Sequence, residues 1–160
     1  DHYDPSKEVL NLSDGVYSSN SIAAMGIAAH EAGHAMQKLE NYAPLNLRSA
    51  IVPAVNICST LSTPMFILGL IFAWQPLVYI GIGLFAASTV FALVTLPVEF
   101  DASKRAIQML SEGGYISGAE EERNVRKVLS AAALTYVAAA VTSLLSLLRL
   151  ILIAKRNDRN

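Results

Sequence analysis

The sequence predicts a mainly α-helical integral-membrane protein with a short N-terminal strand and turn segment. Hydrophobic residues make up 53% of its 160 residues and charged residues only 16%, a balance that is unusual for a soluble domain. Residues 49–98 contain no Asp, Glu, Lys, Arg or His, and residues 128–148 form a second uncharged run. A helix needs roughly 20 predominantly apolar residues to cross a bilayer, so the first run can hold two crossings and the second run one.

We therefore expect about three transmembrane helices, at about residues 49–74, 76–98 and 129–154. Trp74 and Tyr79 lie near the turn between the first two, where interfacial aromatic residues are common. The alternative is a large soluble helical core. It is disfavoured because soluble helices normally keep a charged face toward water, and these segments have none.

The N-terminal segment is polar and rich in turn residues, and residues 8–12 predict one short strand. His2 is expected to be an ordinary turn histidine, with orientation of a substrate or ligand as the alternative. An alanine-rich helix is predicted at residues 22–39, with N-cap candidates at Ser19, Asn20 and Ser21. A proline-containing connector is expected at residues 41–48.

After the second crossing, residues 95–111 predict a helix that emerges into water, because charged residues reappear there. Gly113 and Gly114 are expected to end it. Ser117 and Glu120 have the spacing of a capping box, which predicts the start of a helix that runs into the third crossing.

Two of the three histidines form the motif His30-Glu31-Ala32-Gly33-His34 within the predicted alanine-rich helix. A spacing of four places both imidazoles on one face, about one turn apart, where they can bind one Zn²⁺ ion. Glu31 is rotated by about 100° from His30, so it flanks the metal. A carboxylate in that place can act as a general base, taking a proton from a zinc-activated water and passing it to the leaving amine.

Catalytic zinc needs a third protein ligand and an open position for water. The best candidate is Glu99, because it shares a helical stripe with Ala102, Ala106 and Leu110, and a buried acid requires a partner. An ordinary interfacial glutamate is the alternative reading. Asp101 is the competing ligand, but it is expected to face away from that stripe.

Two crossings joined by a short turn return the chain to its starting side, so the histidine motif and Glu99 are expected on one face of the membrane. The loops on that face are basic, whereas the turn at Trp74 has no charge, which predicts a cytoplasmic site. Seven basic residues support this side: Lys38, Arg48, Lys104, Arg105, Arg123, Arg126 and Lys127. Three others, Lys155, Arg156 and Arg159, would lie outside if the third run spans.

These motifs resemble the YugP-like neutral zinc metallopeptidases of bacterial membranes. The matching stretches are DHYDP at 1–5, SIAAMGIAAHEAGHAMQ at 21–37, APLNLRSAIVP at 43–53, TLPVEFDASKRA at 95–106 and AAALTYVAAA at 131–140. The resemblance implies a membrane protease with His30 and His34 as ligands and Glu31 as the catalytic residue. Members of the family usually have a further N-terminal region with its own membrane segment, so this sequence is expected to be a fragment or a processed product.

The family is in turn similar to HtpX-type membrane proteases, in which a glutamate after a membrane hairpin is the third ligand and an aspartate four positions later supports the ligands. Glu99 matches the glutamate, but Ser103 stands where the aspartate would be. The resemblance leaves open which group supports His30 or His34.

The predicted function is zinc-dependent cleavage of membrane or unfolded polypeptides by a multi-pass protein of the bacterial plasma membrane. The partners are a lipid bilayer and polypeptide substrates, and a net charge of −1 gives no sign of a nucleic-acid partner. A membrane scaffold with a structural or vestigial metal site is the alternative, and a transporter is disfavoured because no acidic residue lies within the crossings. The chain divides into four expected segments: the N-terminal catalytic segment 1–47, the membrane hairpin 48–98, a cytoplasmic helix with connector 99–128, and the third crossing with the tail 129–160.

Overall fold

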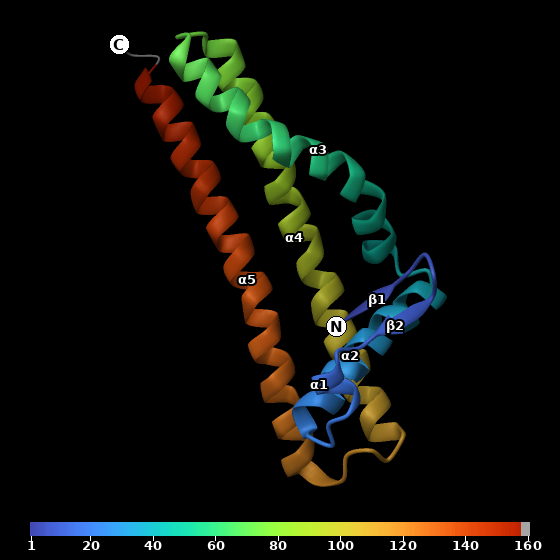
Figure 1. Cartoon of the computed structure of the whole chain (residues 1–160). Coiled ribbons are helices and arrows are strands. Elements are labelled where there is room, and N and C mark those ends of the chain that lie inside the picture. The colour runs from blue at the N-terminus through green and yellow to red at the C-terminus, as the bar shows by residue number, and fades with distance from the viewer. Residues whose placement is uncertain (158–160) are drawn as a thin grey trace. The chain divides into compact units, whose positions relative to one another are not determined.

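The computed structural model describes residues 1–157 and confirms the predicted mainly helical class (Figure 1). Its elements along the chain are β1 (His2–Asp4), β2 (Val9–Asn11), α1 (Asp14–Tyr17), α2 (Ile22–Leu39), α3 (Ala43–Ile71), α4 (Gln75–Glu112) and α5 (Gly118–Asn157). Within this described part, α3, α4 and α5 are the helices long and apolar enough to cross a membrane.

The chain forms two compact units. The first combines Asp1–Asn46 with Leu96–Tyr136, and the second combines Leu47–Thr95 with the chain from Val137 onward. Residues that are distant in sequence, on α2 and on the C-terminal part of α4, therefore belong to the same first unit. The expected division of the chain into four segments stays a prediction.

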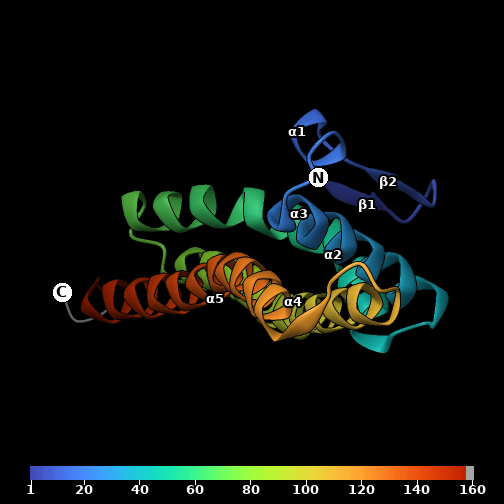
Figure 2. The same cartoon turned by 90° about the horizontal axis from the view of Figure 1, so that it is seen from below.

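The N-terminus of the first unit is a β-hairpin rather than a single strand (Figure 2). β1 pairs antiparallel with β2, and Tyr3 lies opposite Leu10. The strand expected at residues 8–12 corresponds to β2, whereas β1 was not predicted. His2 lies in β1 with its Nε2 atom 3.2 Å from the Asn11 amide nitrogen, so its description as a turn histidine was wrong. β1 is three residues long and only Tyr3 among them is of a type that strands favour, so its strand signal is weak.

The α2 helix confirms the prediction for residues 22–39, and its first turn is capped by Ser21. The Ser21 hydroxyl oxygen accepts a hydrogen bond of 3.1 Å from the backbone N–H of Ala24. Below the cap, Ala29 of α2 packs with Ala106 of α4 and Val125 of α5 in the core of the first unit. Small side chains on α2 let these helices approach closely.

Two expected boundaries were wrong and a third was confirmed. The connector predicted at residues 41–48 is mostly the first turns of α3, where a proline is tolerated because the first N–H groups of a helix have no intrahelical partner. The second crossing and the helix expected at residues 95–111 are one continuous helix, α4, which ends before Gly113 and Gly114 as predicted. The helix predicted to start after Ser117 is α5, which begins at Gly118, although the backbone N–H of Ser117 donates to Glu121 instead of Glu120.

The second unit is a cluster of the apolar helices. Phe66 of α3, Val78 of α4 and Ala154 of α5 form its buried core. A Cβ atom built on Gly81 would lie 2.6 Å from the backbone nitrogen of Phe66, so α3 and α4 pack backbone to backbone there. The Thr89 and Ser143 hydroxyl groups are 2.8 Å apart and add a hydrogen bond between α4 and α5.

The closest approach of α2 to α4 is at Gly33, inside the histidine motif. A Cβ atom at this position would lie 2.5 Å from the carbonyl oxygen of Ala102. Since that neighbour is backbone, it cannot rotate away, and only glycine allows the two helices to lie this close. The approach sets the distance between the histidines and Glu99.

We expect Gly33→Ala to destabilise the protein by about 1–3 kcal/mol and to weaken metal binding, because the added methyl group pushes α2 from α4. Gly26→Ala is the matched control on the same helix, since its added Cβ would meet a Val125 methyl group at an ordinary 3.7 Å. Thermal unfolding in detergent, with and without zinc, measures both effects. Equal unfolding temperatures for the two variants would refute the close-packing argument.

Candidate metal centre

His30 and His34 of α2 and Glu99 of α4 offer ligand atoms that all lie within 4.8 Å of one another. Glu99 Oε2 is 3.1 Å from the Nε2 atom of His30 and 3.6 Å from the Nε2 atom of His34. A tetrahedral zinc site with bonds of roughly 2.0–2.2 Å places its ligand atoms about 3.3–3.6 Å apart. Two imidazoles and one carboxylate are also a known donor set of catalytic zinc. These residues therefore fit a zinc ion.

The Glu99 carboxylate is almost completely buried, with an exposed fraction of 1%. It lies on the predicted apolar stripe of α4, whose next members Ala102 and Ala106 are fully buried. Removing a carboxylate from water is unfavourable unless a cation or hydrogen-bond donors compensate it. A metal ion bound by the two imidazoles would supply this compensation.

The second nitrogen of each imidazole also has a partner. His30 Nδ1 lies 3.1 Å from the Ser103 hydroxyl oxygen, and His34 Nδ1 lies 2.9 Å from the Gln37 side-chain oxygen. Such contacts orient metal-binding imidazoles. In the described structure, Ser103 is the side chain that contacts the outer nitrogen of His30, and Gln37 is the one that contacts the outer nitrogen of His34.

Gln37 is a residue that the sequence analysis did not single out. It is fully buried, three positions after His34. The available signal was a large polar residue one helical turn beyond the motif, on the face that includes His34. Glutamine in a helix is common, so that signal is weak on its own.

Opposing effects act on the pKa of the His34 imidazole. Burial lowers it, but the nearby Glu99 carboxylate and the Gln37 side-chain oxygen favour the protonated ring and outweigh burial, so this pKa lies above its usual value. A metal binds the neutral imidazole and competes with the proton. Metal affinity is therefore expected to fall as the pH falls.

Asp101, the competing ligand, lies outside this three-residue group. Its Oδ2 atom accepts hydrogen bonds from Gln37 Nε2 at 2.8 Å and from Arg105 Nε at 2.5 Å. It does leave the Glu99 stripe, as expected. The new feature is its indirect connection to His34 through Gln37.

The β-hairpin contacts the side chain of Glu31. Its Oε2 atom accepts a hydrogen bond of 3.0 Å from the backbone N–H of Tyr3 in β1. The carboxylate lies next to His30 in sequence but outside the group of three ligand atoms. The Glu31 carboxylate therefore has a backbone donor as a partner and is not one of the three possible ligands.

Two histidines one turn apart on α2 and a buried glutamate on α4 thus form a group that could hold a metal ion. The chain matches the family described as "Putative neutral zinc metallopeptidase" over residues 1–155, and it belongs to that family. It is also 50% identical over 153 residues to "Putative membrane protease YugP" of Bacillus subtilis (strain 168), an alignment that covers 96% of this chain and 68% of the relative. The resemblance expected from the motifs is thus confirmed. No solved structure matches this chain.

We expect Glu99→Ala to weaken zinc binding by about 100-fold or more, because a charged ligand is lost. Asp101→Ala should cost about 10-fold or less, since groups that act through a ligand contribute less than the ligand itself. Competition with a chelator of known affinity measures both constants. The reverse order would make Asp101 the ligand, and full retention in both variants would remove α4 from the site.

Proposed function

We propose that this protein is a membrane-bound zinc-dependent metalloendopeptidase that hydrolyses peptide bonds in protein substrates. The observation that supports this most directly is the group formed by His30, His34 and Glu99, with Glu31 on the same helix as the two histidines. A purely structural metal site has no need for a neighbouring carboxylate that does not bind the metal. The family to which the chain belongs supports the same reaction class.

The proposed roles follow from the surroundings of each side chain. The two imidazoles and Glu99 hold the ion, and the chemistry that zinc supplies when bound is a lowered pKa for a coordinated water and polarisation of the substrate carbonyl. Glu31 acts as the general base, receiving a proton from the attacking water and delivering it to the amine of the departing peptide. The Tyr3 N–H orients the Glu31 carboxylate for both transfers.

The proposed substrates are membrane-associated or unfolded polypeptides at the cytoplasmic face. Two features support this class: the site belongs to a unit formed by segments on either side of the α3–α4 hairpin, and three helices are long and apolar enough to span a bilayer. A multi-pass arrangement with basic loops on the site's side favours the cytoplasm. The relative named a membrane protease agrees with a membrane location.

We expect Glu31→Gln to retain zinc and to lose cleavage by a factor of about 10²–10⁴, because the amide cannot accept the proton. Glu112→Gln is the matched control, since the same substitution there lies at the end of α4 and away from the three-residue group. The assay measures zinc per chain and cleavage of casein or a membrane protein side by side. Cleavage by Glu31→Gln at the parental rate would show that another group is the base. A zinc-loaded parent without cleavage would favour the scaffold alternative.

The proposed sidedness predicts thiol labelling in intact cells. In a Cys58→Ser background, a cysteine at Gln108 should resist a membrane-impermeant thiol reagent until the cells are opened, because the site faces the cytoplasm. A cysteine at Trp74, which is 56% exposed, should react at once. Immediate labelling at Gln108 together with protection at Trp74 would reverse the orientation.

A further inference from the structure

Gln37 connects the two helices that form the metal centre. Its side chain has no exposed surface and makes three hydrogen bonds. The amide oxygen lies 2.9 Å from His34 Nδ1, and the amide nitrogen lies 2.8 Å from both the Val98 carbonyl oxygen and Asp101 Oδ2. The glutamine and the histidine belong to α2, and both partners of the amide nitrogen belong to α4.

These partners leave one orientation for the amide. A backbone carbonyl can only accept a hydrogen bond, and so can the Asp101 carboxylate, which also accepts from the Arg105 guanidinium. Both therefore require the NH₂ group of Gln37. The Gln37 oxygen must then face His34.

The same assignment of donors and acceptors applies to the His34 imidazole. An amide oxygen can only accept, so the nitrogen facing it, Nδ1 of His34, must donate and carry the proton. The lone pair is then left on Nε2, the atom that lies 3.6 Å from Glu99. We infer that Gln37 is a positioning residue that selects the Nδ1–H tautomer of His34 and so prepares Nε2 for the metal.

This inference rests on the proposed zinc site and adds to it a residue that fixes one ligand. His30 is held differently, because a serine hydroxyl can either donate or accept. Ser103 therefore orients the His30 ring without selecting a tautomer. The effect of Gln37 should be specific to His34.

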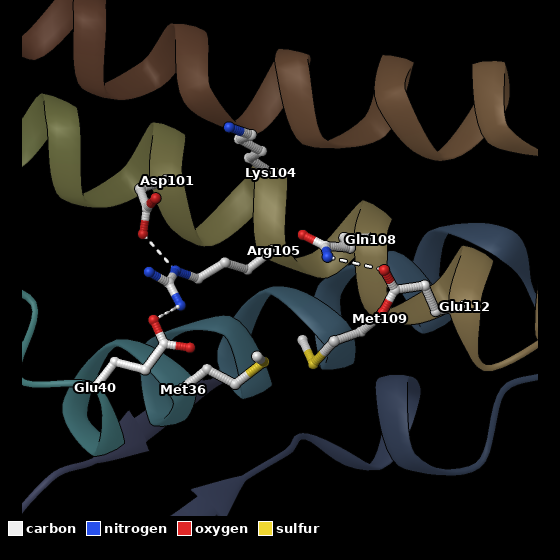
Figure 3. Close-up of a pocket in the computed structure, with 8 residues that line it drawn as sticks. All are labelled: Met36, Glu40, Asp101, Lys104, Arg105, Gln108, Met109 and Glu112. Atoms are coloured by element: carbon white, nitrogen blue, oxygen red, sulfur yellow. Dashed lines mark hydrogen bonds and ion pairs between the residues drawn. The ribbon is translucent and has the colours of Figure 1, made fainter.

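The outer partners make the amide orientation stable. Arg105 lies between Asp101 and Glu40, as Figure 3 shows, with its Nη1 atom 2.6 Å from Glu40 Oε2. It also stacks over the Tyr42 ring at 5.6 Å. This ion-pair group borders a cavity of about 290 Å³ that is also lined by Gln108. The buried amide is thus tied to an anion that is itself neutralised by a fixed cation.

The test is Gln37→Met, which keeps an unbranched side chain of similar length and removes the amide. Gln108→Met is the matched control: it makes the same substitution on α4, where Gln108 contacts Glu112 and has no contact with the histidines in the described structure. Asp101→Asn is a second variant of unchanged size that removes the anion fixing the Gln37 amide. Circular dichroism establishes that each variant is folded.

The first readout uses metal-free protein and does not depend on zinc or cleavage. The chain has only three histidines, so nitrogen NMR of ¹⁵N-histidine-labelled protein in detergent, at a pH where imidazoles are neutral, reports each tautomer. We expect Gln37→Met to move His34 from Nδ1–H toward Nε2–H, with His30 unchanged. Asp101→Asn should produce a smaller shift in the same direction, and Gln108→Met none.

The second readout is zinc affinity, which should fall roughly 10–100-fold in Gln37→Met and stay within twofold of the parent in Gln108→Met. Unchanged His34 tautomer populations in Gln37→Met and Asp101→Asn would overturn the inference, as would a tautomer shift without loss of zinc affinity. A parent chain that binds no zinc would refute the proposed function, whereas the metal-free NMR comparison would still decide the role of Gln37.

Discussion

The buried carboxylate of Glu99 is the constraint on which the rest of the site depends. A carboxylate with 1% exposure must be compensated, and its Oε2 atom lies 3.1 Å and 3.6 Å from the Nε2 atoms of two imidazoles on another helix. These imidazoles can reach it only because Gly33 lets α2 lie against the backbone of α4 at Ala102. The compensation of the Glu99 carboxylate on α4 and the absence of a side chain at Gly33 on α2 thus depend on the same helix contact.

Around this contact, further groups hold the two histidines and Glu31 in place. Ser103 and Gln37 contact the outer nitrogens of the two histidines, and the β-hairpin orients Glu31 through a backbone N–H. Each of these groups comes from a different place in the sequence. The hairpin precedes α2 in the sequence and Glu99 follows it, but all three belong to one compact unit. The geometry that suits metal binding therefore arises from tertiary packing.

The sequence predicted the parts of the fold that follow from local composition. Long apolar runs and an alanine-rich segment with a serine cap were sufficient for α2 and for three helices able to span a membrane. The motif spacing brought His30 and His34 to one face, and the stripe of Ala102 and Ala106 correctly indicated that Glu99 is buried. Whether these residues bind zinc stays a prediction.

The sequence could not predict features that depend on partners distant in the chain. The strand β1 exists because it pairs with β2, and only Tyr3 among its three residues favours a strand. Gln37 has the composition of an ordinary helical residue, and its role emerges only when Val98 and Asp101 are seen beside it. Helix ends were misplaced because α3 tolerates a proline in its first turn and α4 continues through Pro97.

The central claim is that one zinc ion is held by two imidazoles from α2 and one carboxylate from α4. X-ray absorption spectroscopy at the zinc edge, on protein loaded with one equivalent of zinc, tests this claim most directly. The account predicts only nitrogen and oxygen ligands at about 2.0–2.2 Å, with the scattering pattern of two imidazoles that falls to one in His34→Ala. A sulfur ligand, a site with fewer than two imidazoles in the parent, or an unchanged spectrum in His34→Ala would contradict it.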